Sequence, residues 1–158
     1  MSTENHTPNP SNDLDYLAPD IDRVHELSEA LLPVYAQIEA NASLPDATLN
    51  AKLIELMSMV RELHPADMAL VLESLPPKER VIVWKLAEPA DDGDVLLEVS
   101  DAVRETLIES MNKDELLAAV EDLDADDLAA LADDLPHQVV YEALQTRDEE
   151  EREQVKAA

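Results

Sequence analysis

The sequence predicts an all-α fold, a solenoid-like array of short helices, and three observations support this prediction. Apolar residues make up 46% of the 158-residue chain, yet there is no Phe and only one Trp. Leu, Val, Ala, Ile and Met must therefore form the core, a palette that favours helix over sheet. Apolar positions recur every twelve residues along most of the chain, and prolines stand at the boundaries between these units.

The amino-terminal segment differs in composition from the rest of the chain. Residues 1–19 are rich in Asn, Pro, Ser, Thr and Asp and offer little to bury, so we expect a disordered tail there. The remaining length suits one domain, and we expect residues 20–158 to form a single helical-repeat domain.

Two helices are expected before the repeat becomes regular. The apolar spacing predicts one helix from about Asp20 to Asn41, bent at Pro33. A second helix is expected to begin at Asp46, whose side chain suits a helix amino terminus, and to run to Leu63.

The twelve-residue repeat has three apolar columns: the start of each unit, and the positions eight and nine residues after it. All twenty-four positions are apolar in a chain that is 46% apolar overall, and the pattern ends at Arg147. The unit starts are Ala51, Leu63, Leu75, Ala87, Val99, Met111, Leu123 and Leu135.

One long helix cannot carry this repeat, because proline inside a helix costs about 3 kcal/mol or more. Pro65, Pro77 and Pro89 each stand two residues after a unit start, in the first helical turn, where proline loses no hydrogen bond. Asp and Asn supply caps in other units. We therefore expect one helix of about eight or nine residues per unit and about ten helices in all, stabilised by stacking on their neighbours.

The charge of the chain limits its partners. It carries 37 acidic and 11 basic residues, a formal charge of −26, which repels nucleic acid and anionic lipid surfaces. Residues 90–158 hold 22 acidic and 5 basic side chains against 15 and 6 in residues 1–89, so we expect cations to gather on the carboxyl-terminal half. No signal peptide and no apolar run long enough to cross a bilayer is evident, so the segment is expected to be soluble and cytoplasmic.

Two stretches carry a family resemblance: Leu-His-Pro-Ala-Asp-Met-Ala at residues 63–69 with Leu-Pro-Pro-Lys-Glu-Arg at 75–80, and Leu-Asp-Ala-Asp-Asp-Leu-Ala at 123–129 with Leu-Pro at 135–136. Over about residues 50–155 the chain resembles the cytosolic amino-terminal domain of MgtE-type magnesium transporters. The resemblance implies a right-handed superhelix that, in the full transporter, precedes a pair of CBS domains, a connecting helix and a transmembrane pore. It also implies a homodimer, with this segment on the cytoplasmic face of the bacterial inner membrane.

The resemblance also implies a regulatory role for Mg²⁺. In that family, magnesium held between carboxylates of this domain and of the CBS domains keeps the cytosolic part closed, and loss of magnesium allows conduction. Matched unit by unit, the family's interface carboxylates fall on Asp94, Asp126 and Asp127. The family often has a further acidic residue where this sequence has Ala130, so a site that uses this position is expected to be weaker or absent. Asp91, Asp92 and the acidic segment after residue 147 are the next candidates.

The sequence offers no catalytic motif, and we expect no enzymatic activity. Gly93 is the only glycine, which excludes a P-loop or another glycine-rich loop, and the absence of cysteine excludes disulfides and thiolate chemistry. The acidic residues around Asp127 partly mimic a calcium loop, but Asp127 stands where that loop requires glycine. Trp84 lies in a core column. The four histidines show no paired metal-binding spacing: His6, His25, His64 and His137.

Two other functions fit the composition. A helical scaffold similar to the flagellar motor-switch protein FliG has comparable short-helix repeats and would be an adaptor without a metal role. That interpretation predicts a carboxyl-terminal helix of mixed charge, whereas this chain ends in a predominantly acidic stretch. An acidic mimic of nucleic acid would need carboxylates spaced along an extended surface, and the repeat explains their positions more economically.

Overall fold

The computed structural model describes residues 10–147, with side chains from residue 15 onward. Within residues 10–147 there are helices and turns but no strand, which confirms the all-α fold. In chain order the elements are α1 (Pro10–Leu31), the 3-10 turn η1 (Leu32–Val34), α2 (Tyr35–Glu39), α3 (Ala47–Arg61), α4 (Pro65–Ser74), α5 (Pro77–Leu86), the 3-10 turn η2 (Pro89–Asp91), α6 (Asp92–Glu98), α7 (Asp101–Glu109), α8 (Lys113–Glu121), α9 (Ala125–Ala132) and α10 (His137–Gln145).

The first helix begins earlier than the sequence predicts. α1 starts at Pro10 and continues through Pro19, so it begins ten residues before the predicted helix start at Asp20. Leu17 explains part of this difference, because only 2% of its surface is exposed and it lines a cleft together with Met59 of α3 and Leu63. Residues 1–9 of the expected tail and the acidic segment 148–158 lie outside the described residues, and the division into a tail and one domain stays a prediction.

The bend and the second helix agree with the sequence. Pro33 lies in η1, between α1 and α2. After α2, Asn41 takes a positive φ of 56°, a left-handed conformation that asparagine tolerates better than most residues. Asp46 then caps α3, since its side chain accepts a hydrogen bond of 2.7 Å from the backbone N–H of Leu49.

The twelve-residue repeat is visible in where the elements begin. The helices α4, α5, α7, α8, α9 and α10 begin at residues 65, 77, 101, 113, 125 and 137, and η2 begins at residue 89. Each start lies two residues after a predicted unit start. Ala51 is the exception, because it is exposed within α3 and no proline or cap separates it from the helix that Asp46 begins. The regular repeat therefore starts at Leu63.

The predicted apolar columns form the core. From the unit of Leu63 onward, every residue eight positions after a unit start is buried: Val71, Val83, Val95, Leu107, Ala119, Leu131 and Ala143. In the next column Leu72, Trp84, Leu96, Ile108 and Val120 are buried. Ala132 and Leu144, in the last two units, are only half-buried. Packing in this column therefore loosens toward the carboxyl-terminal end of the described stack.

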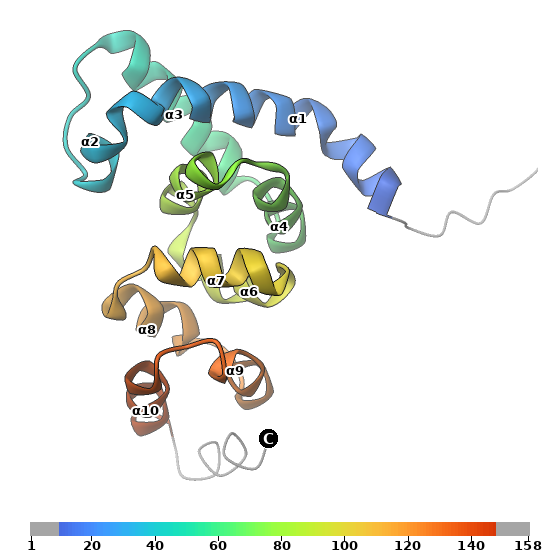
Figure 1. The fold of residues 1–158 in the computed structure, drawn as a ribbon, viewed down its shortest axis with the longest axis vertical. Helices are drawn as coiled ribbons and strands as arrows, with labels where there is room; N and C mark the ends of the chain where they lie inside the picture. Colours follow the sequence, from blue (N-terminus) through green and yellow to red (C-terminus); the bar gives the residue numbers. More distant parts are fainter. Residues whose placement is uncertain (1–9, 148–158) are drawn as a thin grey trace, which may run out of the picture.

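Helices two units apart pack on one another. α4 packs on α6, α6 on α8 and α8 on α10, while α5 packs on α7. α1 lies across α3, α4 and α5 at one end of the stack, and Figure 1 shows the later helices following in order toward α10 at the other. This arrangement is compatible with the predicted solenoid, whose right-handed sense stays a prediction.

Basic side chains satisfy the carboxyl ends of several helices. With one glycine in the chain, the common left-handed glycine cap is not available. Arg61 Nε instead donates to the carbonyl of Leu86 at 3.2 Å, and Lys85 Nζ donates to that of Ser110 at 3.1 Å. Arg147 donates to the carbonyl of Val120 at the end of α8 and to that of Leu123 just after it. A positive charge at this end also interacts favourably with the helix dipole.

Candidate functional site

The three predicted magnesium ligands lie in the first turns of two helices. Asp94 is in the first turn of α6, and Asp126 and Asp127 are in the first turn of α9. Asp124 precedes them as the cap of α9, and its side chain accepts a hydrogen bond of 2.8 Å from the backbone N–H of Asp127. The positive end of a helix dipole favours the ionised form of carboxylates placed there.

The fold brings Asp94 into electrostatic range of Asp127, although 33 residues separate them. α6 packs against α9, which brings Asp94 close enough to Asp127 for their charges to interact. The pKa of Asp127 is raised, first by partial loss of solvent and then by repulsion from Asp124, Asp94 and Asp126. We name the three predicted ligands, together with Asp124, the acidic face.

The acidic face suits a hard divalent cation. Asp94 and Asp126 are exposed and Asp127 is half-buried, so their carboxylate oxygens can meet a cation without rearrangement of the core. Mg²⁺ prefers oxygen ligands, keeps several of its waters and needs only one or two carboxylates from each surface. Ala130 is also exposed on α9. An acidic side chain at this position would face solvent, and this chain has alanine there.

Asp92 differs from its acidic neighbours because it is turned inward. Burial, followed by repulsion from Glu115, Asp91 and Glu88, raises the pKa of Asp92 to about 7. Among the residues that the structure describes, none donates a hydrogen bond to its Oδ1 atom. It lines a cleft of about 300 Å³ together with Lys85 and Glu115. Asp92 is therefore a poorer ligand for a cation on the surface than Asp94.

The other residues that the sequence singled out lie at unit boundaries, in the core or within a helix. His64 precedes α4 and His137 begins α10, both at unit boundaries as predicted. Trp84 is buried in the core. Asp127 is the third residue of α9, so the segment that mimics a calcium loop is helical.

One polar cluster at the other end of the stack was not predicted from the sequence. His25 and Glu29 of α1 lie beside Glu79 of α5. The available signal was the spacing of four residues between His25 and Glu29, which places both on one face of a helix. The sequence could not show that Glu79 joins this cluster, because 54 residues separate it from His25.

Comparison with known proteins identifies the family. Residues 63–158, more than half of the chain, match the family model described as the MgtE intracellular N domain. No curated protein matches the sequence. None of the described helices combines the length and the apolar character that crossing a membrane requires. The matched range begins at Leu63, where the regular repeat begins in the structure. The chain therefore belongs to the MgtE intracellular N domain family, the cytosolic amino-terminal domains of MgtE-type magnesium transporters.

Proposed function

We propose that this domain regulates a magnesium transporter by sensing intracellular Mg²⁺ through Asp94, Asp126 and Asp127. Family membership supports the connection to magnesium transport. The observation that carries the proposal is the packing of α6 on α9, which brings Asp94 near Asp126 and Asp127. Loss of solvent, followed by repulsion from Asp124, Asp94 and Asp126, raises the pKa of Asp127. A divalent cation bound to a cluster of this kind would reduce the repulsion between its carboxylates.

The mechanism follows from electrostatics. Neighbouring carboxylates repel one another, and a cation between them removes the repulsion and adds attraction. If a second acidic surface approaches, one Mg²⁺ with its remaining waters bridges both surfaces. This chain supplies half of such a site, so we expect it to bind magnesium weakly by itself and to close on its partner surface when magnesium rises.

The partner surface in this proposal is the pair of CBS domains of the same transporter. Magnesium at the interface holds the cytosolic part closed, and its loss frees the domain and permits transport through the membrane pore. The transporter acts as a homodimer in the bacterial inner membrane, with this domain on the cytoplasmic side. The domain itself catalyses no reaction, in keeping with a family of regulatory rather than catalytic domains.

The test uses the domain joined to its CBS domains. Replacing Asp94, Asp126 and Asp127 together by Asn keeps the side-chain shape and removes three charges. Compaction on addition of magnesium, followed by small-angle scattering and limited proteolysis, should be lost or shifted to higher concentration. Helicity measured by circular dichroism should not change, because none of these side chains is in the core.

A matched control removes the same charge away from the acidic face. Glu62, after α3, and Glu105 and Glu109 of α7 are exposed, and their joint replacement by Gln should preserve the magnesium response. An equal response in the Asn variant and in the native protein would contradict the assignment of the sensors. If the native protein itself shows no magnesium response, a FliG-like scaffold without a metal role becomes the better description.

A further inference from the structure

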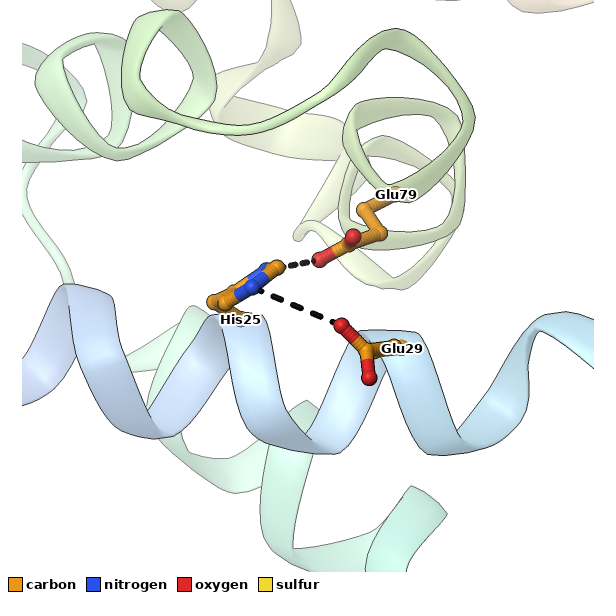
Figure 2. A group of neighbouring side chains, drawn as sticks. All are labelled: His25, Glu29 and Glu79. Carbon is orange, nitrogen blue, oxygen red and sulfur yellow. Dashed lines mark hydrogen bonds and ion pairs between the residues drawn. The ribbon is translucent and has the colours of Figure 1, made fainter.

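A histidine and two glutamates meet between α1 and α5, far along the chain from the acidic face. His25 Nδ1 lies 2.5 Å from Oε1 of Glu79, and His25 Nε2 lies 3.5 Å from Oε2 of Glu29. Figure 2 shows the imidazole of His25 between the two carboxylates, with Glu29 one turn further along the same helix. One possible ligand atom from each residue lies within 4.8 Å of the others.

The two carboxylates have different environments. Glu79 is buried, with 4% of its surface exposed, and its Oε1 atom also accepts a hydrogen bond of 2.8 Å from Ser28 Oγ. It lies in the first turn of α5, where the helix dipole favours a negative charge. The side chain of Glu29 is 67% exposed and that of His25 is 46% exposed. Glu79 is thus held in place, whereas Glu29 is free to adjust.

The position of Glu79 determines which ring nitrogen faces outward. A buried carboxylate that accepts the Nδ1–H proton fixes the tautomer of a neutral histidine and leaves the lone pair on Nε2. Histidines that bind metals commonly donate their other ring N–H to a carboxylate, which orients the ring and makes it a better ligand. In this protein the Nε2 atom faces Glu29, 3.5 Å from its Oε2 atom.

We propose that His25 Nε2 and Glu29 bind a divalent transition metal ion of the zinc class, with Glu79 as the residue that positions His25. One nitrogen and one carboxylate oxygen, four residues apart on a helix face, leave the remaining coordination positions to water. Imidazole ligands suit zinc, copper, iron and nickel, whereas magnesium prefers oxygen alone. The site would therefore respond to a different ion from the acidic face.

The proposed site also has a structural consequence. His25 and Glu29 precede the part of the chain that matches the family model, and Glu79 lies within it. A metal ion would favour the arrangement in which His25 donates to Glu79, and this arrangement ties α1 to α5. The proposal is independent of magnesium sensing, because the two sites share no residue.

The test is a zinc titration of the full 158-residue chain in a large excess of magnesium, which competes for positions built only from carboxylates. Long-range ¹H–¹⁵N spectra of the histidines, recorded under mildly alkaline conditions, report each ring nitrogen. We expect the Nε2 signal of His25 to shift on binding while Nδ1 keeps its proton. His137, exposed at the start of α10, is the internal control and should shift less at the same zinc concentration.

Four variants complete the test. Glu29→Gln lies on the surface and should fold normally while weakening zinc binding by about tenfold or more, and Glu79→Gln should weaken it ~10–100-fold, the usual effect of losing an orienting partner. His25→Gln should abolish zinc binding in excess magnesium, and His137→Gln should not alter it. Equal zinc responses at His25 and His137, or unchanged zinc affinity in Glu29→Gln, would overturn the proposal and leave His25 and Glu79 as an ion pair only.

Discussion

Arg104 repeats, twenty-four residues further along the chain, the backbone contacts that Arg80 makes. Arg80 donates from Nε to the carbonyl of Leu72 at 2.8 Å and from Nη2 to that of Leu75 at 3.1 Å. Arg104 donates from Nε to the carbonyl of Leu96 at 2.7 Å and from Nη2 to that of Val99 at 3.1 Å. Each arginine lies five residues after a unit start and satisfies the end of the preceding helix. The repeat therefore places polar contacts as well as apolar ones.

Replacing Arg104 by Met should destabilise the domain by about 2–3 kcal/mol, because it removes charged hydrogen bonds and leaves enclosed carbonyls without a donor. The side chain of Arg104 is only 13% exposed, so water replaces these bonds poorly. Urea denaturation provides the measurement. Lys113→Met is the control, since Lys113 forms a more exposed ion pair with Glu142, and it should cost at most about 1 kcal/mol. Equal costs for the two variants would mean that the carbonyl contacts contribute little.

Asp92 lies five residues after the unit start Ala87, the position that Arg80 and Arg104 take in the neighbouring units. We expect Asp92 to make the stability of the domain depend on pH. Its pKa rises from 3.8 to about 7 on folding, so the folded state holds the proton more tightly than the unfolded chain. The stabilisation from protonated Asp92 is complete below pH 3.8 and is lost as the pH rises through about 7. Asp92→Asn should therefore be more stable than the native protein at neutral pH, on the order of 1.4 kcal/mol for each pKa unit removed.

The measurement for Asp92 is the difference in unfolding free energy between the variant and the native protein across a pH series without magnesium. Other titrating groups are common to both proteins and cancel in the difference. The stabilising effect of Asp92→Asn should fade toward acid pH. A difference that is constant across the series would show that Asp92 keeps an ordinary pKa.

Gly93→Ala should destabilise the domain even though alanine is the better helix former. A Cβ atom at Gly93 would lie 2.3 Å from the carbonyl oxygen of Ala119 and 3.0 Å from a side-chain carbon of Leu123. Since a backbone atom cannot move aside as a side chain does, α6 and α8 must separate, at a cost of about 1–3 kcal/mol. Helix propensity alone predicts a gain of about 1 kcal/mol, so the sign of the change in thermal denaturation distinguishes the two effects.

Leu72→Asp and Ile108→Asp should each unfold the domain, because both replace a buried core side chain by an unpaired charge. Far-ultraviolet circular dichroism should show loss of most helical signal. Ile54→Asp is the matched control, since Ile54 is 62% exposed on α3, and it should fold normally. Retention of native helicity by both core variants would contradict the assignment of these positions to the core.

The sequence by itself determined the helical repeat and most of its core. Prolines and capping residues at a fixed spacing specify where each helix begins, and these are local effects of backbone geometry. The apolar columns at Leu72 and Ile108 follow from the same spacing. Local signals did not predict the helix over residues 10–19, because Pro19 argues against a helix there while burial of Leu17 favours one. They also wrongly predicted a unit start at Ala51, where no proline or capping residue begins a new helix.

The tertiary structure decided which polar groups meet. Asp94 and Asp127 influence each other because α6 packs on α9, and His25 reaches Glu79 because α1 crosses α5. Contacts of this kind depend on how short helices stack, and side chains 33 or 54 residues apart leave no periodic trace in a single sequence. Burial of Asp92 follows similarly from packing, since its raised pKa arises from the loss of solvent and the carboxylates that surround it.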